Sequence, residues 1–307
     1  MRSIFSATSL ALSLLLVVAG TGCNEDVPAP AAVEESTGLE EPATEPAAVA
    51  KATEPTPAAV KKAGAPASAK PSALVPVAAG KAAKPARRDI VNTAKKRYSQ
   101  FGEELCIRDF FQDRRDGFFL DVGCAFPQRN STTFYLDKHL GWTGIGVDAV
   151  STYAKHWAKD RSDSKFLNFL ISDHSDTDDT FYRAKWPEVS SAKKEMVETP
   201  AGLDQPYDYS EIKVRTITIN KMLEDNGVEK IDFMSMDIEG YQMTALAAFD
   251  IKKYQPELVC IEAYRPDRPK INAWFEERGY KRIDRYLKHD HINWYYTPAD
   301  NPALLIE

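Results

Sequence analysis

Four acidic residues lie where short apolar runs end: Asp121, Asp148, Asp237 and Glu262. A short apolar run that ends in an acid and a turn is typical of a buried parallel strand. Because the carboxyl ends of parallel strands meet at one edge of a sheet, where ligands bind, we expect these carboxylates to share a site. Grouped carboxylates can accept hydrogen bonds from ligand hydroxyl groups, take up a proton or bind a cation.

A turn of small residues follows the first of these acids. Gly123, Cys124 and Ala125 separate Asp121 from the next predicted helix, and small residues let backbone N–H groups approach a ligand closely. The full G-x-G-x-x-G pattern is absent, because Ala125 and Gln128 stand at the later glycine positions. This disfavours a pyrophosphate cofactor, and with it a nicotinamide-dependent dehydrogenase. A purely structural turn remains an alternative.

Two acids have the spacing to contact an adenosine. Asp148 lies 25 residues after Gly123, where a carboxylate can accept hydrogen bonds from both ribose hydroxyls. Asp173 follows the next apolar run and can accept a hydrogen bond from the adenine amino group. An ordinary Asx-type loop residue is an equally good interpretation of Asp173.

Proton transfer or cation binding is expected at the later strand ends. Glu239 and Glu262 can share a site in which crowding raises the pKa of one carboxyl towards neutrality, as a general base requires. With Asp237 as a third ligand they can equally bind a cation, and purely structural hydrogen bonding is the third possibility. His291 is a further candidate base, whereas His289 is interpreted as a surface residue. No Cys/His cluster indicates a zinc site.

The elements that must position these residues alternate between strand and helix. A leading helix is expected over 90–111, and 174–211 is polar and irregular, as in an insertion or lid. The alternation predicts an α/β fold with a doubly wound, mostly parallel, seven-stranded sheet that ends in an antiparallel hairpin. Strands are expected at 117–123, 142–148, 166–171, 213–217, 231–238, 257–261, 280–286 and 292–296.

The runs at 118–149 and 214–264, the latter with Met-Asp-Ile-Glu-Gly-Tyr at 236–241, resemble the FkbM family of methyltransferases. The resemblance covers nearly all of 100–297 and is weakest across 174–211. It implies a class I, Rossmann-like domain that uses S-adenosyl-L-methionine. Known family chemistry implies O-methylation of a hydroxyl, here of a sugar or a related small molecule or glycan.

The same resemblance implies roles for single residues. Asp121, Gly123 and Asp148 would line the S-adenosylmethionine site, Asp237 would lie beside the donor methyl group, and Glu239 would face the acceptor or brace its turn. The sequence departs from the family at three places. Asp148-Ala149 replaces a common Glu-Pro, Gln242 replaces a common Glu, and Ala125-Phe126-Pro127 is bulkier than the usual turn.

The first 23 residues predict an export signal. An apolar stretch at 10–19 is too short to span a membrane and leads to Gly-Thr-Gly-Cys, which ends at Cys23. This resembles a bacterial lipobox, so we expect an exported protein anchored to a membrane through lipidated Cys23. Ordinary cleavage or an uncleaved anchor are alternatives, and the chain is cytoplasmic if no signal is present.

Residues 24–88 predict a disordered linker, because they are rich in Ala, Pro and Lys and contain no aromatic residue. A solvated spacer and a weak tether to anionic lipid are both compatible with its segregated charges. All Trp and Tyr residues fall in 89–307, which we expect to be the methyltransferase domain. The net charge of −6 disfavours nucleic acid as a partner.

Export leads to a second functional hypothesis. The methyl donor is not normally supplied outside the cytoplasm, so the chain can alternatively be a membrane-tethered binding module that kept the fold without turnover. The cysteines that follow Cys23 are odd in number and predict buried thiols rather than a disulfide framework. Those cysteines are Cys106, Cys124 and Cys260.

Overall fold

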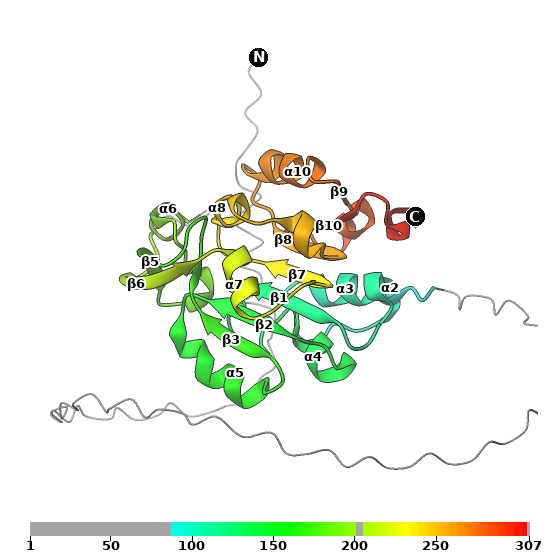
Figure 1. Ribbon diagram of the computed structural model, residues 1–307, viewed down its shortest axis with the longest axis horizontal. Coiled ribbons are helices and arrows are strands. Elements are labelled where there is room, and N and C mark those ends of the chain that lie inside the picture. Colours follow the sequence, from blue (N-terminus) through cyan, green and yellow to red (C-terminus); the bar gives the residue numbers. More distant parts are fainter. Residues whose placement is uncertain (1–86, 201–204, 306–307) are drawn as a thin grey trace, which may run out of the picture. The chain divides into compact units, whose positions relative to one another are not determined.

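Seven strands pair in the order β3-β2-β1-β7-β8-β10-β9 in the computed structural model, which describes residues 87–200 and 205–305. The first five strands in this order run parallel, and β10 is antiparallel to both β8 and β9. The predicted doubly wound, mostly parallel sheet is therefore confirmed (Figure 1). The strands are β1 (Phe118–Val122), β2 (Thr143–Asp148), β3 (Lys165–Asn168), β7 (Phe233–Met236), β8 (Leu258–Glu262), β9 (Tyr280–Arg282) and β10 (Asn293–Pro298).

Helices cover both faces of this sheet, as the burial of successive strand residues requires. Leu120 and Val122 of β1 pack with α7, α8, α9 and α10, whereas Phe119 packs with α3 and α4 on the opposite face. Apart from α6, which lies between β5 and β6, the helices that follow the first strand are α4 (Phe134–Leu140), α5 (Ala154–Asp160), α7 (Ile219–Asp225), α8 (Gln242–Ala247), α9 (Ile251–Tyr254) and α10 (Arg268–Glu276).

The terminal hairpin has a strand order that the sequence did not predict. β9 and β10 are antiparallel as expected, but β10 lies between β8 and β9. The short 3-10 helix η3 (Asp284–Lys288) connects the two strands. The last strand of the domain is thus internal, and its Tyr296 ring stacks on Phe275 of α10 with ring centroids 4.0 Å apart.

The predicted leading helix is wrong as a single element. Two short helices, α2 (Ile90–Thr93) and α3 (Glu103–Phe111), are separated by nine non-helical residues (94–102). Side-chain carboxylates satisfy the backbone N–H groups of that connection: Glu104 accepts from Arg97 and Tyr98, and Glu103 accepts from Phe101. These local hydrogen bonds compete with continuation of the helix.

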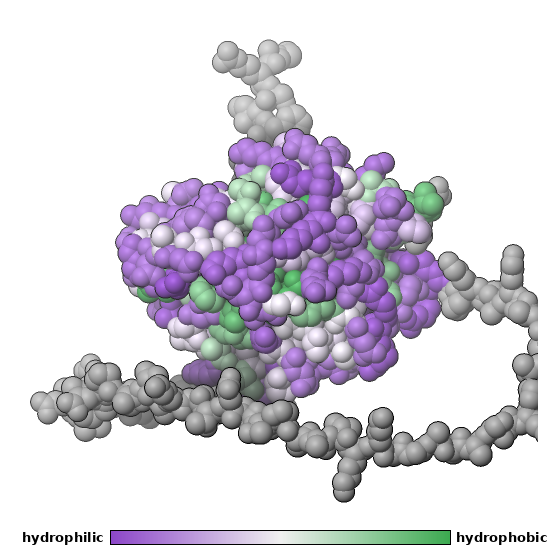
Figure 2. Space-filling view, viewed as in Figure 1, coloured by the Kyte–Doolittle hydropathy of each residue, from purple (hydrophilic) through white to green (hydrophobic). Residues whose placement is uncertain are grey.

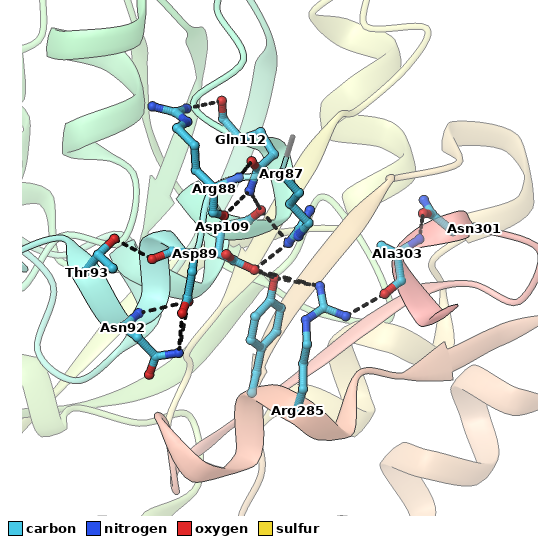
Figure 3. Close-up of polar contacts among 11 residues, drawn as sticks. Arg87, Arg88, Asp89, Asn92, Thr93, Asp109, Gln112, Arg285, Asn301 and Ala303 are labelled. Carbon is cyan, nitrogen blue, oxygen red and sulfur yellow. Dashed lines mark hydrogen bonds and ion pairs between the residues drawn. The ribbon is translucent and has the colours of Figure 1, made fainter. Parts of the chain in front are cut away.

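The start of the described chain is bound to the domain through Asp109 of α3. Arg87 donates to both the side chain and the carbonyl of Asp109, and Tyr286 donates to the same carboxylate at 2.9 Å (Figure 3). Arg88 and Gln112 exchange hydrogen bonds beside them. Two residues of the predicted 24–88 linker therefore belong to the domain. The predicted signal at 1–23, Cys23 and the rest of the linker lie outside the described residues.

The segment from 174 to 211 was expected to be irregular, which is wrong. It contains β5 (Asp178–Ala184), the 3-10 helix η2 (Pro187–Val189), α6 (Lys194–Glu198) and the start of β6 (Tyr209–Ile217). The predicted third strand is also divided, because β3 joins the main sheet while β4 (Leu170–Ile171) pairs with β6. The second sheet has the order β4-β6-β5 and lies at the end of the main sheet opposite α2 and α3 (Figure 1).

The surface and the cysteines fit a folded polar domain. The face in Figure 2 is mostly hydrophilic, with apolar residues in small patches. Cys106, Cys124 and Cys260 are buried free thiols, as predicted. Across the part of the chain that the structure describes, no helix has both the length and the apolar character needed to cross a membrane.

Candidate active site

Two adjoining cavities lie beyond the carboxyl ends of the parallel strands. A narrow cavity of about 60 Å³ lies beside β2 and β4, and a large cavity of about 710 Å³ extends across β7, β8 and the start of β10. We call them the narrow arm and the chamber. Both are lined by Gly123, Ala125, Glu188, Asp237 and Glu239, so they adjoin along these residues, and we call the two together the cleft.

The turn after β1 forms the ridge between them. Gly123 has φ +80°, and a Cβ atom at this position would lie 1.8 Å from the Asp237 carbonyl oxygen. Only glycine allows this close approach of the turns that follow β1 and β7. Ala125 and Glu239 also have left-handed φ values, of +44° and +48°. Such strain in non-glycine residues clusters at functional sites.

Asp148 lies at the end of β2 and holds the β1 turn. Its carboxylate accepts hydrogen bonds from the backbone N–H groups of Ala125 at 3.0 Å and Val150 at 2.8 Å. A carboxylate has about four acceptor positions, so two remain for ligand hydroxyls in the narrow arm that Asp148 lines. Burial raises the pKa of Asp148 to about 6, and the two N–H groups oppose that rise.

The rest of the narrow arm is largely apolar. Phe169, Ile171, Phe181 and Ile238 are among its walls, which suits a flat aromatic base. The bulky Phe126 does not line either cavity, because its ring packs edge-on against Tyr153 with centroids 4.8 Å apart. The unusual turn therefore leaves the cleft open, and the residues present fit an adenosine.

Asp121 is buried at the end of β1 and lines the chamber. It accepts a hydrogen bond from the Thr133 hydroxyl at 2.6 Å, and the buried guanidinium of Arg161 donates to the same hydroxyl. Burial raises the pKa of Asp121 to about 6, while Thr133 and Arg161 hold it down. Cys124 also lines the chamber. Most of the donor-site residues that were predicted at the end of β1 therefore lie together.

Asp173 does not line either cavity. Its half-exposed carboxylate hydrogen-bonds His174 at 2.7 Å, and the other ring nitrogen of His174 lies 3.2 Å from Asp179. The histidine lowers the pKa of Asp173. The structure thus places Asp173 in a surface cluster with His174, apart from the other predicted donor-site residues.

Three carboxyl groups form the floor of the chamber. Asp237, Glu239 and Glu262 each offer an oxygen within 4.8 Å of the others. Asp237 opens into the chamber, whereas Glu262 is buried and accepts a hydrogen bond from Gln242 at 2.7 Å. Glu239 accepts a hydrogen bond from the Tyr264 hydroxyl at 2.6 Å. The sequence-predicted cluster is therefore assembled.

These three groups do not titrate alike. Burial, the charge of Asp237 and the charge of Glu239 raise the pKa of Glu262 well above its ordinary value. Burial and Asp237 raise the pKa of Glu239 to about 8. Burial also raises the pKa of Asp237, but a hydrogen bond from Glu262 opposes the rise. Both glutamates therefore favour their protonated forms, and Asp237, which accepts the hydrogen bond from Glu262, is the group of the three best placed to be ionised.

The two candidate histidines differ in position. His291 is exposed in the chamber wall, where its carbonyl oxygen accepts a hydrogen bond from Arg268 at 2.9 Å. His289 lines neither cavity, and its buried Nε2 has no hydrogen-bond partner among residues 87–200 and 205–305.

Sequence reasoning missed the walls of the chamber. The segment between β5 and β6 contributes residues from η2 and α6, and the Ser191 hydroxyl fastens this segment to the Glu239 carbonyl at 2.8 Å. Tyr264 and Arg265 lie two and three residues after the end of β8. They could have been predicted, because ligands bind beyond the carboxyl ends of parallel strands. The missed lining residues include Phe101, Glu188, Val189, Met196, Tyr207, Tyr264, Arg265, Arg268 and Trp294.

Comparison with known proteins gives one family match. A family model described as the methyltransferase FkbM domain matches residues 121–282, more than half of the chain. No curated protein matches the chain.

Several solved structures are similar at low identity. A TehB-like SAM-dependent methyltransferase from Corynebacterium glutamicum is 12% identical over 65% of this chain and 89% of that chain, with a TM-score of 0.36. A SAM-dependent methyltransferase from Thiobacillus denitrificans, in complex with S-adenosyl-L-homocysteine, is 11% identical over 66% and 77%, with a TM-score of 0.32. Because these TM-scores are low, the interpretation of the site does not depend on them.

Proposed function

The chain belongs to the FkbM family of S-adenosylmethionine-dependent methyltransferases, and from this premise we propose that it methylates a hydroxyl group of a sugar, a glycan or a related small molecule. The observation that carries this proposal is the position of Asp237. It lies in the floor of the chamber and also lines the narrow arm. An acceptor hydroxyl and a donor methyl group can therefore meet beside one carboxylate.

The cleft offers a contact for each part of the donor. Asp148 would accept hydrogen bonds from the ribose hydroxyls, and the apolar walls of the narrow arm would hold the adenine. The turn from Gly123 to Ala125 and the Asp121 carboxyl face the region between the arm and the chamber. When bound, S-adenosylmethionine supplies a methyl group that is already electrophilic.

The protein must then remove a proton from the acceptor. Asp237 would take the proton of the acceptor hydroxyl as a general base, while the bound donor would supply the methyl group, lose its C–S bond to that group and leave as a neutral thioether. Protonated Glu262 donates a hydrogen bond to Asp237, and Gln242 fixes the position of Glu262. Glu262 is thus a positioning residue, and Asp237 is the proposed base.

The chamber walls that the sequence did not predict would orient the acceptor and exclude water from it. The segment fastened by Ser191 places Val189 and Met196 against the chamber opposite the strand ends. Such closure aligns the reacting atoms and lowers the entropy cost of their meeting. The rings of Tyr264 and Trp294 add apolar faces with polar edges to the chamber, which suits a sugar with both C–H faces and hydroxyls.

Calorimetry with S-adenosylhomocysteine tests the donor site. The wild-type chain is expected to bind it with a micromolar dissociation constant, and Asp148→Asn to weaken binding about tenfold, which corresponds to one lost charge-assisted hydrogen bond. Asp163→Asn, at an exposed position that lines neither cavity, is the matched control and should bind like wild type. Absence of binding by the wild-type chain would favour the non-catalytic binding module.

We also propose that the chain is exported and anchored through lipidated Cys23. The apolar run at 10–19 and the Gly-Thr-Gly-Cys that follows support this proposal. Mass spectrometry of the mature protein should find an acylated Cys23 as its first residue, and an intact Met1 would contradict the anchor. An exported enzyme would also need a supply of its donor outside the cytoplasm.

A further inference from the structure

Two arginines in the chamber wall form no ion pair with any residue that the structure describes. Arg265 and Arg268 both line the chamber. Among residues 87–200 and 205–305, no carboxylate lies within 4.0 Å of either guanidinium. Arg282, whose guanidinium faces the same Trp294 ring as Arg268, is in contrast paired with Asp284 at 2.6 Å.

Arg268 is held in place by neutral groups. Its Nε donates to the Ala263 carbonyl and its Nη2 to the His291 carbonyl, both at 2.9 Å. Its guanidinium lies 5.1 Å from the centre of the Trp294 ring. A guanidinium has five N–H donors, so these contacts orient the group and leave most of its donors available. They also leave its charge uncompensated.

The local environment makes this charge costly in the free protein. Burial, and the like charges of Arg265 and Arg282, lower the pKa of Arg268. Half-buried guanidinium groups are normally paired with an anion, because desolvated charge without a partner is unfavourable. An incoming anionic group would remove that penalty.

We propose that Arg265 and Arg268 form a subsite for a carboxylate or phosphate group of the acceptor. The acceptor is then an acidic sugar or a sugar phosphate, not a neutral one. This inference rests on the proposed function for the identity of the acceptor, but the binding of an anion can be measured without turnover. Bidentate contacts of this kind give arginine its preference for carboxylates and phosphates.

The floor of the chamber does not oppose such a ligand at neutral pH. The raised pKa values of Glu239 and Glu262 favour their protonated forms, so the negative charge in the floor near the acceptor is mainly that of Asp237 and Asp121. The chamber thus has an acidic end for the reacting hydroxyl and a basic end for the anionic group. Its volume of about 710 Å³ falls in the usual range for small-molecule sites.

The carboxylate of the methyl donor is a second source of the same chemistry. Asp148 and Gly123, which would hold the nucleoside, follow β2 and β1, whereas Arg265 and Arg268 follow β8. In the sheet, β1 and β7 separate β2 from β8. This separation favours the acceptor as the source of the anion.

Calorimetric titration of inorganic phosphate into the full chain tests the subsite, with and without saturating S-adenosylhomocysteine. Arg265→Gln and Arg268→Gln should each weaken phosphate binding at least tenfold in both titrations. Arg282→Gln, at the paired arginine, should change it less than twofold. Equal binding by all four proteins, or no phosphate binding by wild type, would overturn the proposal.

A second titration, with nucleosides, identifies whether the anionic group belongs to the acceptor or to the methyl donor. If the arginines hold the donor carboxylate, Arg265→Gln and Arg268→Gln will weaken binding of S-adenosylhomocysteine but not of 5′-methylthioadenosine, which lacks the carboxylate, and this result also overturns the proposal. Unchanged binding of both nucleosides supports it. Failure of wild type to bind either nucleoside counts against the proposed function alone, because the phosphate titration of the free chain still tests the subsite. Exposed Arg265 keeps the test valid if Arg268→Gln lowers the melting temperature.

Discussion

Glu262 is the most buried carboxyl in the floor of the chamber, and its proton determines the state of Asp237. Since the Glu262 pKa is raised well above its ordinary value, it acts as a hydrogen-bond donor to Asp237 at neutral pH. A glutamine at this position can make the same contact, whereas an asparagine in place of Asp237 cannot accept a proton. The two positions therefore have different roles although both are acids.

Asp237→Asn is predicted to lower kcat for methyl transfer by about 10²–10⁴-fold, the usual effect of losing a general base. Glu262→Gln should retain activity within about threefold and leave the acidic limb of the pH–rate profile unchanged, because Glu262 is already uncharged in that pH range and glutamine can donate the same hydrogen bond. Transfer of a radiolabelled methyl group measures both. Equal losses in the two variants would show that Asp237 is not a distinct base.

Removal of divalent cations by chelation tests whether Asp237, Glu239 and Glu262 act in proton transfer or ligate a cation. We expect EDTA to leave methyl transfer unchanged, because Glu239 and Glu262 hold protons at neutral pH. A loss of activity that Mg²⁺ restores would show instead that the three carboxylates ligate a cation.

Glu239 makes stability depend on pH. Its pKa rises from 4.5 to about 8 on folding, so the folded state binds this proton more tightly than the unfolded state. Its stabilising contribution is complete below pH 4.5 and is lost as pH rises through about 8. Glu239→Gln should therefore become more stable relative to wild type between pH 5 and pH 9.

Thermal melting at pH 5, 7 and 9 measures this difference. Glu229→Gln, at an exposed acid with no hydrogen bond in the structure, is the control and should follow wild type at each pH. A constant difference between Glu239→Gln and wild type over this range would contradict the raised pKa.

At the scale of elements, strand ends were predictable and the insertion was not. The strands that contain or directly precede Asp121, Asp148, Asp237 and Glu262 are short and mostly apolar, so their ends and their acids could be located from the local pattern alone. The walls between β5 and β6 depend on long-range contacts, such as the hydrogen bond from Ser191 to the carbonyl of Glu239, 48 residues away. A polar local sequence does not encode such contacts.

The leading helix and the order of the last strands failed for related reasons. The break at 94–102 depends on Glu103 and Glu104 accepting backbone N–H groups, although both acids are good helix formers. β10 lies between β8 and β9, but the sequence would show the same alternation of residues if β9 lay next to β8. The pattern therefore does not determine the order of these strands. The side-chain pattern thus predicted which residues lie at the carboxyl ends of the parallel strands better than it predicted the elements that complete the sheet.

Ser191 connects the insertion to the site, so its hydroxyl should affect both. Ser191→Ala removes the hydrogen bond to the Glu239 carbonyl and the acceptor for the Lys193 N–H. We expect faster hydrogen exchange over 193–198 and a several-fold loss of S-adenosylhomocysteine affinity. Ser210→Ala, at an exposed position in β6, is the control. Unchanged exchange in Ser191→Ala would show that other contacts fasten the segment.

At the scale of the whole molecule, Arg87 connects the start of the described chain to α3. A variant that lacks residues 1–86 should melt within about 2 °C of the full chain, because it keeps the contacts between Arg87 and Asp109. A variant that lacks 1–89 should melt about 2–8 °C lower, since a charge-assisted contact to a buried carboxylate is lost. Arg87→Gln in the full chain should reproduce most of this loss. Identical melting temperatures of all these proteins would show that the contacts of Arg87 do not stabilise the domain.

The internal position of β10 has a consequence for synthesis. Trp294 and His291, which complete the chamber, follow both β8 and β9 in the chain, and β10 is therefore translated after the two strands between which it pairs. Until it emerges, β8 has an open edge and the nascent domain has half a binding site. Ligands that contact this wall can therefore stabilise the domain only after β10 has been synthesised, and a truncation before residue 291 leaves the chamber open on that side.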